Sequence, residues 1–495
     1  MTRLSRGRPL LVVALLALVG CGTSNTNFVT GESQRGAYTW AQEVQLGTEA
    51  DGQIISQFGL YDEDPELTAY VNRIAEDVLQ TSAYTDANTP VEVRNTPFTF
   101  RILDSGVVNA FALPGGYVYV TRGLLAYLEN EAQLAVVLGH EIGHVLGRHS
   151  SRQAFEAQRN QFGLLGAAVL GGVLGGGQVA EGLLNYGGTG LQLLQLKNGR
   201  GAEREADLAG VAYSEFAGYD ATQAARFFVA LQRLGEDAGQ GSIPNFLSTH
   251  PDPGERAQTI PTLAAQYDPQ GTEIEAEAYL RQIEGIVVGE DPRQGFVEGS
   301  TFYHPDLAFR FSFPQGWRTQ NSPAAFIMGE PNGRAVIQLT LAQGTSAREA
   351  ARALASQQGV QVTGDGAVRV SGYDAYRVEG RAQQQNGVLG FSATFIEYGG
   401  NVYQILGLTS ADAFNSYVRS FRQTADSFAR LTDRAYLNRQ PSRLEVTRLR
   451  NASTIESLLR GRRLPDGLTA SQVAIMNQVE LSERIPAGNS VKLPD

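Results

Sequence analysis

Residues 130–150, NEAQLAVVLGHEIGHVLGRHS, contain the segment that decides the fold of the first half of the chain. Asn130 is a favoured residue at a helix start, and Gln133 follows it at the spacing of a capping box. Apolar residues then recur at helical spacing as far as Leu146. The stretch therefore predicts a buried helix that carries the sequence His140-Glu141-Ile142-Gly143-His144.

This HExxH sequence predicts a metal site. Residues four apart on a helix share one face, so the imidazoles of His140 and His144 can reach one Zn²⁺ ion. Glu141 lies beside that position, where its carboxylate can take a proton from a metal-activated water. The alternative is a helix with two solvated histidines. The apolar surroundings favour the metal, because a buried histidine pair needs a partner.

A third ligand is expected further along the chain. The metzincin pattern HExxHxxGxxH is met at Gly147 but fails at Ser150, so the helix is expected to continue there rather than turn. The next acidic cluster is Glu203-Arg204-Glu205-Ala206-Asp207, on a predicted helix. Glu203 and Asp207 share a face of it and Glu205 points away. One of the two can ligate zinc while the other holds a ligand histidine from behind; a solvated acidic helix start is the alternative.

HEIGHVLGRHS followed by EREAD resembles the zinc metallopeptidase family of the CAAX prenyl endopeptidases and HtpX, in its soluble, exported branch. Three further stretches match that branch: NAFALPGG at 109–116, VTRGLL at 120–125, and LSTHP at 247–251 with Glu255-Arg256. The resemblance spans roughly residues 45–270. It implies that Glu203 is the third ligand of one zinc ion per chain, that Asp207 supports a ligand from behind, and that the segment of His250 lies at the active site.

His250 is expected in a loop, because the residue before a proline avoids helical geometry. Two roles are open. The imidazole can donate to the oxyanion that forms during peptide hydrolysis, or it can reach the zinc as a fourth ligand and hold the enzyme latent. A surface histidine that caps a turn is the alternative.

Residues 109–120 predict a strand, a Pro-Gly-Gly turn and a second strand. A strand at the edge of the cleft could bind a substrate peptide as an additional strand. This interpretation makes Asn109, Ala110, Phe111 and Ala112 candidate substrate-binding residues; an ordinary hairpin is the alternative.

The N-terminus predicts export. Residues 1–20 have a basic start and a short apolar core, as a signal peptide has. They end in Leu18-Val19-Gly20-Cys21, which resembles the bacterial lipobox, and Cys21 is the only cysteine. We expect a lipid on Cys21, a polar tether over 21–45 and a periplasmic location, at the outer membrane rather than the inner one. A plain secretory signal is the alternative.

The rest of the chain divides by pattern. We expect a mainly α-helical zincin-type (gluzincin) peptidase domain over 46–285, with a helical stretch over 254–285 closing it. An α+β domain with an antiparallel sheet is expected over 296–432, and a small LysM-like module, or a bland small domain, over 441–495. The glycine-rich stretch 163–180 is expected to be a mobile flap or a buried hairpin rather than a membrane span.

The HExxH motif predicts a zinc-dependent endopeptidase, and the resemblance implies a role in quality control or processing of envelope proteins. Its partners would be polypeptide substrates, the membrane through Cys21, and peptidoglycan through the tail. A net charge of −11 argues against nucleic-acid binding. Two rivals are a zinc-bearing chaperone or peptidoglycan-attached scaffold with little proteolysis, and a peptidoglycan amidase.

Overall fold

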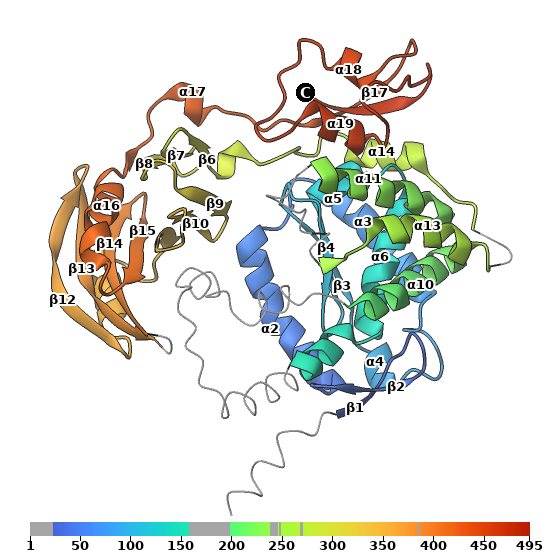
Figure 1. Ribbon diagram of the computed structural model, residues 1–495, viewed down its shortest axis with the longest axis horizontal. Helices are drawn as coiled ribbons and strands as arrows, with labels where there is room; N and C mark the ends of the chain where they lie inside the picture. Colours follow the sequence, from blue (N-terminus) through green and yellow to red (C-terminus); the bar gives the residue numbers. More distant parts are fainter. Residues whose placement is uncertain (1–22, 158–198, 238–245, 247–248, 268–270, 385–386) are drawn as a thin grey trace, which may run out of the picture.

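The computed structural model describes residues 23–157, 199–237, 246, 249–267, 271–384 and 387–495. Figure 1 shows a helical N-terminal part, a domain built on antiparallel sheets, and a small C-terminal module beside the helical part. The expected multidomain organisation is confirmed at this level. The predicted signal peptide, Cys21 and the glycine-rich stretch 163–180 lie outside the described residues. Within the described ranges, no helix is both long and apolar enough to span a membrane.

The helical part combines helices with one small three-stranded sheet, in which β3 runs parallel and β4 antiparallel to the central β5. Its elements are α2 (Trp40–Phe58), α3 (Pro65–Gln80), α4 (Val91–Arg94), β3 (Thr99–Leu103), β4 (Ala110–Leu113), β5 (Tyr117–Thr121), α5 (Arg122–Tyr127), α6 (Glu131–Leu146), α10 (Arg200–Phe216), α11 (Ala224–Asp237), α13 (Pro253–Ala264) and α14 (Ala276–Ile283). The helical stretch expected over 254–285 contains two helices, α13 and α14, and the described residues between them, 265–267 and 271–275, are not helical.

Helix α6 carries the HExxH sequence through the centre of this part. Asn130 caps its first turn by accepting a hydrogen bond from the Gln133 backbone at 2.9 Å, and every residue of the helix is buried. Helix α10 crosses it closely because two glycines of α6 leave room: a Cβ on Gly143 would lie 2.7 Å from the Cβ of Ala209, and one on Gly139 would lie 3.0 Å from Gly210 Cα. This close packing brings the acidic first turns of α10 over the two histidines.

The chain turns at the end of α6, where the sequence led us to expect a continuing helix. The helix ends at Leu146, Arg148 has a left-handed backbone with φ of 54°, and a new helical segment covers 149–157. The turn is held from outside: the Arg148 guanidinium donates to Glu43 on α2 at 2.9 Å and to the Tyr38 carbonyl at 2.9 Å. Such contacts between distant segments cannot be seen in the local pattern.

Residues 23–45, expected to form a polar tether, are folded against the end of α6. β1 (Thr23–Thr26) and β2 (Ser33–Gly36) pair antiparallel, and α2 begins at Trp40. The Phe28 backbone donates to the carbonyl of Leu146 at 3.0 Å, and the Gln34 side chain donates to that of Gly147 at 2.8 Å. Polar groups of this segment form hydrogen bonds to the end of α6, so the segment is not a free linker.

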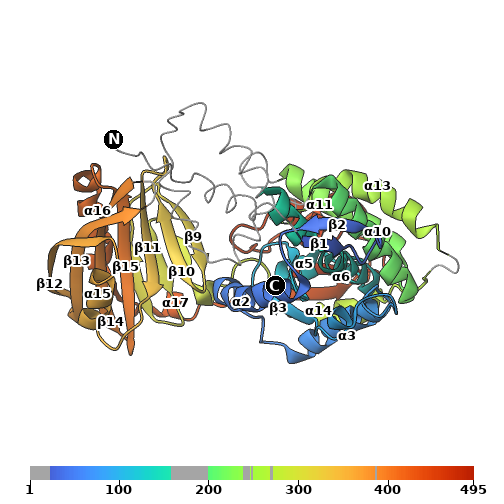
Figure 2. The same cartoon turned by 90° about the horizontal axis from the view of Figure 1, so that it is seen from below.

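The second domain contains two antiparallel sheets. Figure 2 shows the larger one, and strands β6, β7 and β8 of the smaller one are labelled in Figure 1. The larger has the strand order β12-β13-β14-β15-β11-β10-β9 and the smaller β16-β8-β7-β6. The strands are β6 (Phe296–Glu298), β7 (Thr301–His304), β8 (Phe309–Ser312), β9 (Arg318–Ser322), β10 (Ala325–Gly329), β11 (Ala335–Leu341), β12 (Val360–Val370), β13 (Tyr373–Gln384), β14 (Gly387–Tyr398), β15 (Asn401–Ser410) and β16 (Ala429–Arg430). Helices α15 (Ala347–Ala355) and α16 (Phe414–Asp426) pack on the larger sheet.

The C-terminal module has two antiparallel strands, β17 (Leu444–Arg448) and β18 (Ser490–Pro494), with the short helices α18 (Ile455–Leu458) and α19 (Ala470–Met476) between them. Its Lys492 is only 1% exposed. The Lys492 ammonium donates to the carbonyls of Ala126 and Leu128, at 2.9 and 2.7 Å, and pairs with Glu129 at 3.0 Å. The module is therefore fastened to the loop that leads into α6.

Replacing Lys492 by alanine should destabilise the whole helical part. The change leaves the Glu129 carboxylate and two buried carbonyls without their cation, and breaking a buried ion pair costs about 3–5 kcal/mol. Urea denaturation of the full chain measures the free energy of unfolding, with the exposed Arg484→Ala as the control from the same module. An unchanged free energy for Lys492→Ala would show that the module is docked without stabilising its neighbour.

Candidate metal centre

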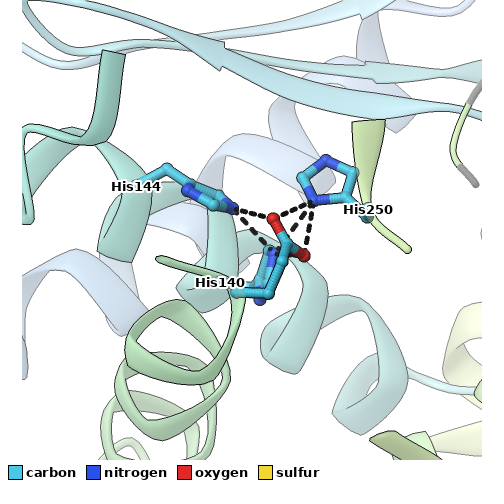
Figure 3. A group of neighbouring side chains, drawn as sticks. His140, His144 and His250 are labelled. Carbon is cyan, nitrogen blue, oxygen red and sulfur yellow. Dashed lines mark hydrogen bonds and ion pairs between the residues drawn. The ribbon is translucent and has the colours of Figure 1, made fainter. Parts of the chain in front are cut away.

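Four buried side chains meet between α6, α10 and the loop that precedes α13. They are His140, His144, Glu203 and His250, and one nitrogen or oxygen atom from each lies within 4.8 Å of those of the others. Figure 3 shows the three histidines turned toward one another. The structure thus brings together residues that are up to 110 positions apart in sequence.

The potential ligand atoms crowd into one small space. The Nε2 atoms of His140 and His144 are 3.0 Å apart, and the Glu203 carboxylate lies 3.3 Å from the latter and 3.6 Å from the former. Histidine nitrogen together with carboxylate oxygen is a donor set that suits zinc. A metal cation bound between these buried nitrogen and carboxylate atoms would compensate for their burial, so the residues fit the metal that the HExxH sequence predicts.

Asp207 contacts Nδ1 of His140, the ring nitrogen that faces away from the ligand group. The resemblance implies this supporting position for Asp207. Its carboxylate accepts from the His140 Nδ1 at 3.0 Å and also pairs with Arg256 at 2.6 Å. Burial alone would lower the pKa of His140, but the Asp207 and Glu203 carboxylates outweigh it and raise that pKa to about 9. Arg256 also stacks on the Phe228 ring at 4.1 Å, which fixes the guanidinium in place.

His144 is supported by a second pair of residues that the sequence analysis missed. Its Nδ1 lies 2.7 Å from Nδ1 of His149, and the His149 Nε2 lies 3.0 Å from a Glu205 oxygen. Burial lowers the pKa of His149, while the hydrogen bond from His149 lowers that of Glu205 to about 2. Glu205 does point away from the ligand group, as expected, but toward a buried histidine rather than solvent.

Glu141 is placed where its carboxylate can act as a general base. It is 1% exposed, and neither carboxylate oxygen has a hydrogen-bond partner among the described residues. Burial raises its pKa, which brings a carboxylate nearer to the range useful for general-base catalysis. Nε2 of His250 lies 3.5 Å from one of the Glu141 carboxylate oxygens.

Strand β4 lies at the edge of its sheet, with β5 on one side only. It contains Ala110, Phe111 and Ala112, and Asn109 precedes it. The Asn109 side-chain oxygen is buried and accepts no hydrogen bond within the described part of the chain. A small cleft beside His144 is lined by the residues that end this strand, Ala112, Leu113 and Pro114. The geometry thus places the predicted substrate strand next to the ligand group.

A buried HExxH helix, a carboxylate presented by a neighbouring helix and a free glutamate beside them define a metalloprotease centre. Comparison with known proteins gives the same class. Residues 65–264, which lie in the helical part, match the model of peptidase family M48.

Several proteases are similar to this part of the chain. The beta-barrel assembly-enhancing protease of Yersinia pestis is 35% identical over 213 residues, 42% of this chain and 41% of that protein. That of Escherichia coli K12 is 31% identical over 258 residues, 50% and 49% of the two chains. The mitochondrial metalloendopeptidase OMA1 of Schizosaccharomyces pombe is 31% identical over 222 residues, 44% of this chain and 60% of that one. The matches to the bacterial relatives thus span about half of their length or less.

Proposed function

We propose that the protein is a zinc-dependent endopeptidase, with one zinc ion held by His140, His144 and Glu203. The observation that carries this proposal is the buried group of ligand atoms within 4.8 Å of one another, beside Glu141, whose oxygens accept no hydrogen bond from the described residues. Zinc, when bound, polarises the substrate carbonyl and lowers the pKa of water to about 7.

The protein residues divide the remaining work. Glu141 accepts the proton of the attacking water and passes it to the leaving amine. Asp207 and Arg256 hold His140 with its Nδ1 toward the carboxylate, so that Nε2 faces the ligand group. The free edge of β4 binds the substrate backbone as an additional strand, with Asn109 accepting one of its N–H groups. Main-chain binding of this kind favours extended, unfolded polypeptides of varied sequence.

His250 holds the site closed at rest in this proposal. Its Nδ1 lies 3.1 Å from the Glu203 carboxylate and 3.2 Å from the His140 Nε2, inside the ligand group. An imidazole in that position takes the space that the attacking water needs. Of the two roles open from the sequence, this geometry supports the latching ligand rather than the oxyanion donor.

The His250→Ala variant should therefore cleave peptides faster than the wild type. The expected ratio of variant to wild-type activity is the inverse of the fraction of wild-type molecules that are open at rest, because only open molecules cleave the peptide. Steady-state kinetics on a fluorogenic peptide measures it. A fall in kcat of about 10²–10³ with unchanged KM would instead assign the oxyanion role, and wild-type kinetics would exclude both.

We propose an envelope location and a role in quality control or processing of envelope proteins. Support comes from the lipobox-like sequence at Cys21 and from relatives named beta-barrel assembly-enhancing proteases. The substrates would be misfolded or maturing envelope polypeptides, and a lipid on Cys21 would anchor the enzyme, at the outer membrane rather than the inner one. The tail module remains a candidate for binding peptidoglycan, which a pull-down on purified sacculi tests.

Cleavage of casein with and without a chelator separates this function from its rivals. A chaperone or scaffold would suppress aggregation without cutting, and an amidase would cut peptidoglycan and leave casein intact. The proposed endopeptidase cuts casein, stops when the metal is removed and resumes when zinc is restored.

A further inference from the structure

The N-terminal segment 23–36 reaches the metal centre through a chain of polar side chains that are buried except for the half-buried Glu205. Asn27 follows β1 and is 3% exposed, and its side-chain nitrogen donates to a Glu205 oxygen at 2.7 Å. Glu205 contacts His149, and His149 contacts His144. A residue close to the N-terminus is thus the fourth member of a series that ends on a metal ligand.

The hydrogen bonds of this series are consistent in direction. A His144 that binds metal through Nε2 carries its proton on Nδ1 and donates it to Nδ1 of His149. His149 then carries its own proton on Nε2 and donates it to Glu205, whose carboxylate only accepts. Asn27 and Arg152 supply the remaining donors, Arg152 at 3.2 Å. Every link therefore pairs one donor with one acceptor and fixes the tautomer of His144.

Local features keep the series in place. A Cβ on Gly147 would lie 2.4 Å from the His149 Nε2, so glycine is needed there for the ring to approach. The Asn27 oxygen accepts from the Val29 and Thr30 backbones, at 3.0 and 3.2 Å, which leaves its nitrogen free to face Glu205. The Phe28 backbone is bonded to the last residue of α6. The segment is therefore built onto the end of the metal helix.

We propose that the N-terminal segment completes the metal centre: Asn27, Glu205 and His149 position His144, so zinc affinity depends on contacts made by residues 23–36. The proposal rests on the proposed function, in that the site must hold zinc. Because the segment directly follows Cys21, a lipid there and the metal centre would be joined by one short stretch of folded chain.

The test is the zinc dissociation constant of the full chain, measured by competition with a chromophoric chelator. His149→Phe leaves His144 and Glu205 without their partner and should weaken zinc binding about 10–100-fold, as loss of such supporting residues does. Asn27→Ala removes one hydrogen bond to a charged group and should weaken it about 3–10-fold. The visible spectrum of the cobalt-loaded protein should shift in both, since the orientation of a ligand changes.

Two comparisons distinguish positioning from packing. His149→Gln keeps an acceptor oxygen and a donor nitrogen and should bind zinc more tightly than His149→Phe, whereas a space-filling role favours the aromatic ring. Asn25→Ala is the matched control: Asn25 is a buried asparagine of the same segment, but it bonds the Tyr38 carbonyl and not Glu205. It should bind zinc like the wild type, and the melting temperature of each metal-free variant shows that the chain is folded.

The outcomes separate the two claims. A wild-type protein that binds no zinc overturns the proposed function. A wild type that binds zinc tightly, with His149→Phe and Asn27→Ala equal to it, overturns the positioning role alone. Equal weakening by Asn25→Ala and Asn27→Ala would also overturn it, because general loosening of the segment would then explain the loss.

Discussion

The Glu141→Gln variant should bind zinc normally and lose about 10²–10⁴-fold in kcat, the range that general acid–base catalysis supplies. Glutamine has the shape of glutamate but cannot accept a proton at neutral pH. Glu141 is not among the candidate ligands, and its oxygens have no hydrogen-bond partner among the described residues, so its replacement breaks no hydrogen bond there. Peptide cleavage and metal content, measured on the same preparation, check both halves of the expectation.

A control for this variant is available on the same helix. Glu131 is also buried in α6, but it accepts from Tyr70 and pairs with Arg73, away from the ligand group. Glu131→Gln should keep kcat and reduce thermal stability instead. Full activity of Glu141→Gln would show that Glu141 is not the general base. Loss of zinc from this variant would mean that Glu141 helps to hold the metal.

Replacing Glu203 by alanine should weaken zinc binding by more than about 100-fold, because supporting residues alone are worth 10–100-fold. The change removes a carboxylate that contacts His140, His144 and His250 together. Chelator competition measures the affinity. Neighbouring Arg204, which is exposed and pairs with Glu255 on the surface, gives the matched control Arg204→Ala.

Retention of zinc by Glu203→Ala would reassign the third ligand. The residue that could replace it is His250, whose nitrogen already lies within reach of the group. The double variant with His250→Ala then distinguishes a substituted ligand from a site that needs only the two helix histidines.

The residues on α6 and α10 were predictable because their spacing along the chain indicates which of them share a helix face. Two histidines four apart mark one helix face, and two acidic residues four apart mark another, so the sequence identifies both surfaces before the fold is known. The strand-turn-strand at 109–120 was predictable for a similar reason, since its alternation and its turn residues are local.

The supporting residues were not predictable in this way. His149 contacts His144 only because the chain turns at Arg148, and that turn is held by Glu43 and Tyr38 from a segment about 100 residues earlier. The polar residues of 23–45 look like a linker because their partners, at the end of α6, are far away in sequence. Composition shows that a segment is polar; only the fold shows which buried groups its side chains bind.

Reconstitution of the metal-free protein tests the central claim most directly. The full chain is stripped with a chelator, and peptide cleavage is followed while zinc is added back in known amounts. The account predicts no cleavage without metal and a linear return of activity that saturates at one zinc ion per chain. Cleavage that survives removal of the metal, or a protein that takes up no zinc, would contradict it.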